Sequence, residues 1–219
     1  MASGKRRIAF TRKLLDWYDR AARDLPWRRT RDPYRIAVSE FMLQQTQVSR
    51  VEQYYPRFLK RFPTIERLAA ARPKAVREAW EGLGYYRRAE SLHALSRVVG
   101  KAYGGKLPAD PVELDKLPGV GRYTAGAIAC FAYEKPVPAV DTNVARVVRR
   151  AFIEGNHSPR TTHHQVWAVA AALVPKSGPR AWKFNQAIME LGARVCVARQ
   201  PRCPACPVRV NCRTGRRVK

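Results

Sequence analysis

Apolar residues recur at helical spacing along almost the whole chain, and strand-like alternation never lasts more than a few positions. The pattern therefore predicts an all-α protein. Helix boundaries agree with it: Pro63-Thr64 can cap a helix, Pro73 suits a first helical turn, and Gly104-Gly105 can end a helix. The predicted helices are Ile8–Arg23, Arg35–Gln47, Val51–Arg61, Ile65–Ala70, Pro73–Trp80, Arg87–Tyr103, Val112–Lys116, Arg122–Tyr133, Asn143–Phe152, His163–Val174 and Ala181–Leu191.

The order of these helices predicts two lobes. The Pro-containing run 134–138 suits a crossover, and the other connections are short. We expect residues 27–135 to form a central helical module, and residues 1–26 with 136–219 to form a second lobe. A cleft between two such lobes is where a ligand site is expected.

At 219 residues the chain is long enough to bury a core without disulfide staples. No apolar run follows the basic N-terminal residues, and no segment approaches the ~20 apolar residues that span a bilayer. We therefore expect a soluble, cytoplasmic protein with no membrane partner. Disulfides are uncommon in that compartment, so clustered cysteines are interpreted as metal or cluster ligands.

The charge is large and uneven. Lysine and arginine total 42 against 17 acidic residues, a formal net charge of +25. Arginine predominates, and after Asp141 the only acids are Glu154 and Glu190. Because arginine is well suited to bind phosphate, this balance points to a nucleic acid partner. The alternative is a compositional bias without a specific partner.

Four cysteines near the C-terminus carry the strongest single signal. Cys196, Cys203, Cys206 and Cys212 follow the spacing C-x6-C-x2-C-x5-C in an Arg-rich stretch. Four thiolates in one short loop can bind a tetrahedral metal ion or an iron–sulfur cluster. Zinc modules usually show two paired knuckles and only one C-x2-C is present, so a [4Fe–4S] cluster is favoured over zinc.

A glycine-containing turn is a candidate phosphate site. Gly119 and Gly121 lie in Leu-Pro-Gly-Val-Gly-Arg between a short helix and a longer apolar one. Glycines let the backbone approach a ligand, and the N–H groups at the next helix's N-terminus favour an anion. The alternative is an ordinary turn between two helices.

Two acids are candidates for chemistry. Asp141 directly precedes a predicted helix, where the simplest interpretation is an N-cap; capping would also keep a cleft carboxylate ionised. Glu40 lies within an apolar stretch, and a carboxyl group among apolar side chains can act as a general acid near neutral pH. The alternative for Glu40 is an ordinary glutamate on a helix surface.

Amides and tyrosines form a second group of candidates. Gln44, Gln45 and Gln47 could insert into a base stack, or could simply lie at a solvated helix end. Tyr85 and Tyr86 follow a Gly-Leu-Gly turn and are either core aromatics or part of a turn that binds the DNA backbone.

Taken together, these segments resemble the helix–hairpin–helix (HhH-GPD) superfamily of DNA glycosylases from Leu25 to Arg213, most closely its adenine DNA glycosylase branch. The resemblance is carried by Leu-Pro-Trp (25–27), Ser39-Glu40, Met-Leu-Gln-Gln-Thr-Gln (42–47), Gly-Leu-Gly-Tyr-Tyr (82–86), Leu-Pro-Gly-Val-Gly-Arg (117–122), Val-Asp-Thr-Asn (140–143), Asn185-Gln186-Ala187 and the four-cysteine loop 196–212.

This resemblance implies a role for each motif. Residues 119–122, namely Gly119, Val120, Gly121 and Arg122, would grip a DNA phosphate, and the four cysteines would bind a [4Fe–4S] cluster. Asp141 would be the catalytic aspartate, supported by Asn143 and Tyr123. Glu40 would protonate the departing base. Relatives that also cut the DNA backbone carry a lysine nucleophile where this chain has Tyr123, so the resemblance implies a glycosylase without lyase activity.

The implied function is release of a flipped base from double-stranded DNA that carries a mismatched or damaged base, by a monomer. Adenine opposite guanine or 8-oxoguanine is the expected substrate. Since the sequence runs to Lys219, we expect the chain to lack the C-terminal domain that reads 8-oxoguanine in the adenine branch. The alternatives are a thymine or uracil glycosylase acting on T·G or U·G mismatches, and a non-catalytic DNA-binding module.

Overall fold

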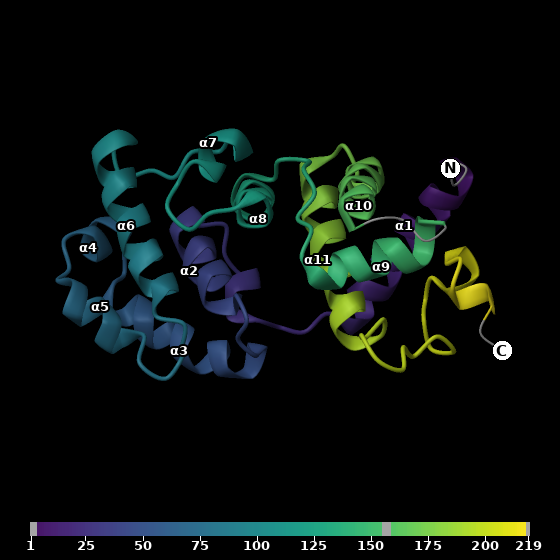
Figure 1. The fold of residues 1–219 in the computed structure, drawn as a ribbon, viewed down its shortest axis with the longest axis horizontal. Coiled ribbons are helices and arrows are strands. Elements are labelled where there is room, and N and C mark those ends of the chain that lie inside the picture. Colours follow the sequence, from purple (N-terminus) through teal and green to yellow (C-terminus); the bar gives the residue numbers. More distant parts are fainter. Residues whose placement is uncertain (1–3, 155–158, 218–219) are drawn as a thin grey trace. The chain divides into compact units, whose positions relative to one another are not determined.

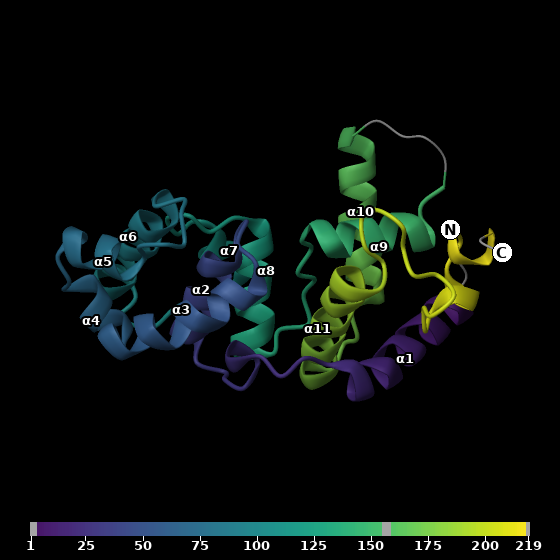
Figure 2. The same ribbon diagram turned by 90° about the horizontal axis from the view of Figure 1, so that it is seen from below.

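The computed structural model describes residues 4–154 and 159–217. Within these ranges every regular element is helical, which confirms the predicted all-α class (Figure 1, Figure 2). None of the described helices has the length and apolar character needed to cross a membrane. The α-helices are α1 (Gly4–Ala21), α2 (Pro33–Leu43), α3 (Val48–Arg61), α4 (Ile65–Ala69), α5 (Pro73–Ala79), α6 (Arg87–Ala102), α7 (Pro111–Asp115), α8 (Arg122–Tyr133), α9 (Thr142–Phe152), α10 (Pro159–Leu173) and α11 (Gly178–Arg194).

The helices begin at residues suited to start them. The Thr64 hydroxyl accepts a hydrogen bond from the Arg67 amide and caps α4. Pro73 is the first residue of α5, where its missing N–H costs nothing. The Asp110 carboxylate accepts from the Val112 amide and caps α7. Local sequence therefore determines these boundaries.

The end of α2 differs from the prediction. The pattern predicts a helix as far as Gln47, but α2 ends at Leu43. Gln45 has φ +55°, a left-handed conformation that a right-handed helix cannot contain. The Thr46 amide turns back to the Leu43 carbonyl at 3.3 Å. Residues 44–47 thus form a tight turn before α3.

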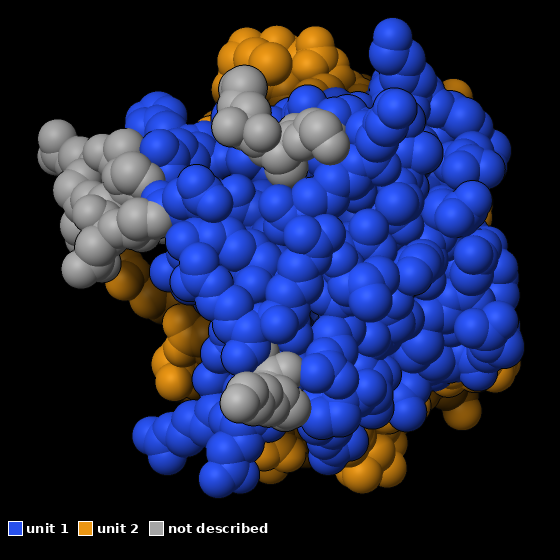
Figure 3. Space-filling view, turned by 90° about the vertical axis from the view of Figure 1, so that its right-hand side faces the viewer, with its two compact units in different colours: residues 1–23, 134–219 blue, residues 24–133 orange. Residues whose placement is uncertain are grey.

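The chain divides into two units, coloured separately in Figure 3. One contains residues 24–133; the other contains residues 1–23 together with residues 134–219. The sequence pattern predicts these bounds at 27–135 and at 1–26 with 136–219.

In residues 24–133, α2 lies among α3, α6 and α8 (Figure 1). Its apolar residues are buried on nearly every side, as expected for a central helix. The Tyr34 hydroxyl donates to the Phe62 carbonyl at 2.7 Å, which ties the start of α2 to the end of α3. The fully buried rings of Phe58 and Trp80 meet edge to face at 5.7 Å. This packing holds α2 in a fixed position.

In the other unit, α1, α9, α10 and α11 surround a second apolar core. The rings of Phe10 and Phe152 meet edge to face at 4.9 Å within it. Glu190 on α11 has no exposed surface, and Arg23 donates to its two carboxylate oxygens at 2.7 and 3.0 Å. A buried carboxylate needs such a partner, so this ion pair joins the segment after α1 to α11.

Candidate active site

Glu40 lies on the central helix α2, and only 4% of its surface is exposed. Its neighbours Phe41 and Met42 are fully buried. The hydroxyl of Tyr123, on α8, donates a hydrogen bond to Glu40 Oε2 at 2.7 Å. The structure therefore brings together two of the predicted catalytic side chains that are far apart in sequence. A carboxyl group in apolar surroundings with a hydroxyl partner is suited to proton transfer.

The turn before α8 sets the position of Tyr123. Gly119 has φ +73°, and a Cβ there would lie 2.5 Å from Ser91 Cβ and 2.8 Å from Phe41 Cε1. Only glycine fits, so the turn packs directly against α2 and α6. Gly121 is exposed and open, while Val120 points into the core. An open glycine beside the first N–H groups of α8 suits a phosphate.

The predicted DNA-contacting amides and tyrosines also lie in this unit. Gln45 and Gln47 are exposed, Gln44 and Tyr86 are half-buried, and Tyr85 is 63% exposed. The turn before α3 and the turn before α6 border one hollow of about 370 Å³. Its lining residues are Gln45, Thr46, Gln47, Arg50, Gly82, Leu83 and Gly84. Two motifs nearly forty positions apart in the sequence thus share one surface.

Asp141 is the N-cap of α9. One carboxylate oxygen accepts from the Val144 amide at 2.7 Å, and the other accepts from Asn143 Nδ2 at 2.8 Å. Burial raises the pKa of Asp141 above its ordinary value; these hydrogen bonds and the charge of Arg146 oppose the rise. The expected cap is present, but burial outweighs its effect on the pKa.

Asn185 on α11 binds the backbone of the irregular segment 137–139, which leads to Asp141. Its Oδ1 accepts from the Ala139 amide at 3.0 Å, and its Nδ2 donates to the carbonyls of Val137 and Ala181 at 3.0 and 3.1 Å. Asn185 is 2% exposed and Ala139 is fully buried, so the Ala139 amide depends on this bond, whereas Val137 is half-buried. The direction in which the chain enters α9 therefore depends on one side chain.

A hydrogen-bonded path runs from Asp141 towards the cysteine loop. Asn143, which donates to Asp141, accepts from Arg146 Nη2 at 2.7 Å. The same guanidinium donates to the carbonyls of Gly192 and Cys196, each at 2.7 Å. A Cβ at Gly192 would lie 2.7 Å from Asn143 Cβ, so the two helices approach closely here. Asp141 is thus connected to the backbone of the first cysteine.

The four cysteines gather in one place. All are half-buried free thiols. Burial raises the pKa of Cys206 to about 11, and the nearby thiols of Cys196, Cys203 and Cys212 add to the rise. Within the described ranges, no three His, Cys, Asp or Glu side chains form a group suited to a single metal ion.

Donors to sulfur accompany two of these thiols. Arg150 Nη1 lies 3.4 Å from Cys196 Sγ, and the Gly215 amide donates to Cys212 Sγ at 3.3 Å. Four cysteines in one loop, with N–H donors directed at two of the sulfur atoms, have the chemistry of ligands that can hold an iron–sulfur cluster. The residues therefore fit such a group.

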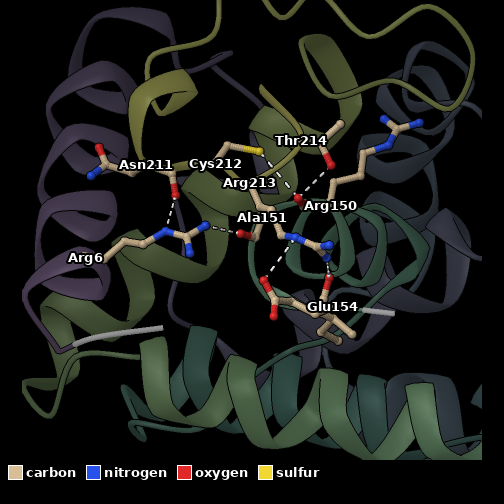
Figure 4. Close-up of polar contacts among 9 residues, drawn as sticks. Arg6, Arg150, Ala151, Glu154, Asn211, Cys212, Arg213 and Thr214 are labelled. Atoms are coloured by element: carbon tan, nitrogen blue, oxygen red, sulfur yellow. Dashed lines mark hydrogen bonds and ion pairs between the residues drawn. The ribbon is translucent and has the colours of Figure 1, made fainter. Parts of the chain in front are cut away.

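The C-terminal end of α9 holds the cysteine loop, as Figure 4 shows. The Arg150 carbonyl accepts from the Thr214 hydroxyl at 2.8 Å. The Ala151 carbonyl accepts from Arg6 Nη2 at 2.6 Å, and Arg6 Nε reaches the Asn211 carbonyl at 2.9 Å. The Arg150 and Ala151 carbonyls lie in the last turn of α9, where a helix leaves its carbonyls without intrahelical partners.

Comparison with known proteins places this geometry in a family. Residues 38–172 match the HhH-GPD superfamily of base excision DNA repair proteins. The chain belongs to this superfamily. The matched residues include the Glu40–Tyr123 pair, both turns around the hollow, and Asp141 with its cap.

Individual HhH-GPD relatives extend over most of the chain. It is 51% identical to the adenine DNA glycosylase of Mycolicibacterium smegmatis over 197 residues, which cover 90% of this chain and 66% of that protein. It is 45% identical to the adenine DNA glycosylase of Homo sapiens, covering 96% of this chain and 40% of the human protein. This chain therefore spans about two thirds of the first relative and two fifths of the second.

Solved HhH-GPD structures share the fold over nearly the full length. A thermostable thymine-DNA glycosylase superposes with a TM-score of 0.91 at 32% identity, with 100% of both chains covered. Endonuclease III in a trapped covalent intermediate with DNA superposes with a TM-score of 0.82 at 26% identity, covering 99% of this chain and 98% of that one.

Sequence reasoning gave no role to Asn185, Arg146 or Arg150. One signal was available for the arginines, since Asn143, Arg146 and Arg150 fall on one face of a predicted helix that begins next to Asp141. Asn185 belongs to Asn185-Gln186-Ala187, one of the motifs that carry the resemblance, but the motif alone does not indicate which groups its side chain binds.

We expect Asn185→Ala to destabilise the protein by roughly 1–3 kcal/mol, because it leaves the buried Ala139 amide without its acceptor and removes the donor to the Val137 carbonyl. Urea unfolding measures the loss. Hydrogen exchange at the Ala139 amide should accelerate in the variant more than exchange within α9. Asn185→Asp keeps the acceptor for that amide and is the matched control, so its Ala139 exchange should stay slow. Unchanged hydrogen exchange at the Ala139 amide in Asn185→Ala would contradict this role of Asn185.

Proposed function

We propose that this chain is a DNA glycosylase that hydrolyses the N-glycosidic bond of adenine mispaired with guanine or 8-oxoguanine. The observation that carries the proposal is the buried Glu40–Tyr123 pair in a chain 51% identical to an adenine DNA glycosylase. The chain spans only part of the length of these relatives, so the proposed activity has to be measured on the chain itself.

In the proposed reaction, the enzyme first extrudes the adenine from the duplex. Extrusion costs a few kcal/mol and is cheapest at a mismatch. Glu40 then gives a proton to a ring nitrogen of the base, and the C1′–N bond breaks with the electron pair leaving on adenine. C1′ becomes cationic, and the ionised Asp141 carboxylate stabilises it. Water adds to C1′ and loses a proton, which leaves free adenine and an abasic site.

The strand stays intact in this proposal. Cleavage by a lyase needs an amine that forms a Schiff base with C1′. Tyr123 supplies a phenolic hydroxyl, and that hydroxyl is hydrogen-bonded to Glu40.

The proposed partner is double-stranded DNA, which the net charge of +25 favours. The open turn at Gly121 and the first turn of α8 would bind a backbone phosphate. Gln44, Gln45, Gln47, Tyr85 and Tyr86 would contact the opened duplex. We infer that the protein works as a monomer in the cytoplasm, where it associates with chromosomal DNA.

We also propose that Cys196, Cys203, Cys206 and Cys212 bind a [4Fe–4S] cluster. When bound, the cluster would cross-link the loop through its four thiolates and supply a redox-active centre. The donors from Arg150 and Gly215 to sulfur support this assignment.

Protein purified without oxygen should contain about four iron atoms per chain if the cluster is present. Cys206→Ser should lose most of that iron and its visible absorption. Cys130→Ala, at a fully buried position on α8, is the matched control and should retain the iron. Zinc in place of iron in the wild-type protein would overturn the assignment.

Asp141→Asn should slow adenine release by roughly three orders of magnitude or more while it preserves DNA binding, because asparagine still caps a helix. Single-turnover assays on duplexes with A·8-oxoguanine, A·G, T·G and U·G pairs measure the rate of base release. Borohydride trapping on the same duplexes should yield no covalent product.

Asp110→Asn is the control for this variant, since Asp110 also caps a helix but is exposed. Its rate should match the wild type. Release of thymine or uracil in preference to adenine would favour the second candidate, which the superposition with a thymine-DNA glycosylase supports. No release from any duplex would overturn the enzymatic proposal.

The raised pKa of Asp141 predicts the acid side of the pH profile. The reaction needs the ionised carboxylate, so the rate should fall as pH drops through a value above the ordinary 3.8. Single-turnover rates against pH locate this midpoint. A midpoint at or below 3.8 would contradict the proposed burial effect.

Stability gives an independent measurement of the same shift. The folded protein binds a proton at Asp141 more tightly than the unfolded chain does, so ionisation destabilises the folded state above that pKa. Asp141→Asn should therefore raise the melting temperature at pH 7, and its advantage over the wild type should shrink as pH falls towards 4.

A further inference from the structure

Arg88 is the second residue of α6, and it is only 7% exposed, whereas its neighbour Arg87 is exposed. Burial lowers the pKa of the Arg88 guanidinium from its ordinary value. A buried charge is costly unless it is well solvated by the protein. The surroundings of this side chain therefore need an explanation.

The first acceptors of Arg88 lie at the end of α2. Its Nη1 atom is 3.1 Å from the Phe41 carbonyl and 2.8 Å from the Met42 carbonyl. These are carbonyls of the last helical turn, which have no N–H partner within the helix. A positive charge is also favoured at this end by the helix dipole.

The second group of acceptors lies in the turn that follows α2. Nη1 also contacts the Gln44 carbonyl and donates to Thr46 Oγ1 at 2.9 Å. Between them, Gln45 is held at φ +55°, a conformation that is unfavourable for a residue other than glycine. Arg88 thus holds a strained turn whose Gln45 side chain is exposed.

The third group of acceptors lies in the turn before α6. Nη2 donates to the carbonyls of Leu83 and Gly84 at 3.1 and 3.0 Å, and Nε lies 3.4 Å from the Tyr85 carbonyl. The guanidinium also lies 5.5 Å from the ring centres of both Trp80 and Tyr85. Tyr85 itself has φ +48°.

All seven acceptors are neutral, and none is a carboxylate. Buried charges usually have an opposite charge as partner. Here the guanidinium instead bridges two turns that border the hollow of about 370 Å³. Its planar fork can reach several backbone groups at once, which the single ammonium of lysine cannot do.

We propose that Arg88 is a positioning residue for base extrusion, which locks the turns at 44–47 and 82–85 into one rigid wedge that enters the duplex. The inference rests on the proposed function. Preordering the turns in the free protein removes the entropy cost of ordering them when DNA binds. Exposed side chains at Gln45 and Tyr85 then meet the base stack in a fixed geometry.

The test compares Arg88→Lys and Arg88→Met with Arg87→Met, the matched exposed control. Single-turnover excision is measured on an A·G duplex and on a duplex with adenine opposite an abasic site, where extrusion is cheaper. Both Arg88 variants should lose roughly tenfold to a hundredfold on A·G and several-fold less on the abasic partner. Arg87→Met should leave the ratio of the two rates unchanged.

Equal losses on the two duplexes, or no loss in Arg88→Lys, would overturn the proposal, since a merely structural defect lowers both rates alike. Thermal unfolding verifies that the variants fold. If Arg88→Met does not fold, Arg88→Lys alone provides the test. Fluorescence of 2-aminopurine at the mismatch reports unstacking without any bond cleavage. It should rise with the wild type and stay low with Arg88→Lys, so the inference can be judged even where no base is released; a rise equal to that of the wild type would contradict it.

Discussion

The hydrogen bond from the Val144 amide to the Asp141 carboxylate fixes two things together, the start of α9 and the orientation of the acid. From this cap, α9 presents Arg146 and Arg150 to the cysteine loop, and its last carbonyls accept hydrogen bonds from that loop. An anion at the N-terminus and cations near the C-terminus both suit the helix dipole. The proposed catalytic acid and the proposed cluster loop therefore depend on the same eleven-residue helix.

The arginines explain how a strongly basic chain stays ordered. Arg6, Arg88, Arg146 and Arg150 donate to backbone carbonyls that would otherwise lack partners. A guanidinium is suited to this because it is weakly hydrated and presents its donors in a planar fork. The excess of arginine over lysine thus has a role inside the fold as well as in the proposed DNA binding.

Sequence alone predicts the features that are local. Caps and proline positions predict the helix boundaries at Thr64 and Pro73, and an acid in an apolar run marks Glu40. The missed boundary of α2 depends on φ +55° at Gln45, a residue type that rarely adopts it.

The remaining features could not be predicted because their partners are distant in sequence. Tyr123 is 83 positions from Glu40, and Asn185 is 46 positions from Ala139. The hydrogen bond of Tyr123 to Glu40 adds a contact that the sequence does not predict, and its support of Asp141 stays a prediction. No spacing rule connects residues at such separations; only packing of the helices brings them together.

Two charged side chains, Asp141 and Arg88, each lie at the end of a helix. Asp141 is a half-buried carboxylate at the N-terminus of α9, where N–H groups replace lost water. Arg88 is a buried cation at the C-terminus of α2, where carbonyls do the same. Without those donors, burial would raise the pKa of Asp141 further. Without burial, water would screen its charge from a developing cation. The proposed reaction needs both cap and burial, because the cap orients the charge and burial would strengthen its effect on a cation at C1′.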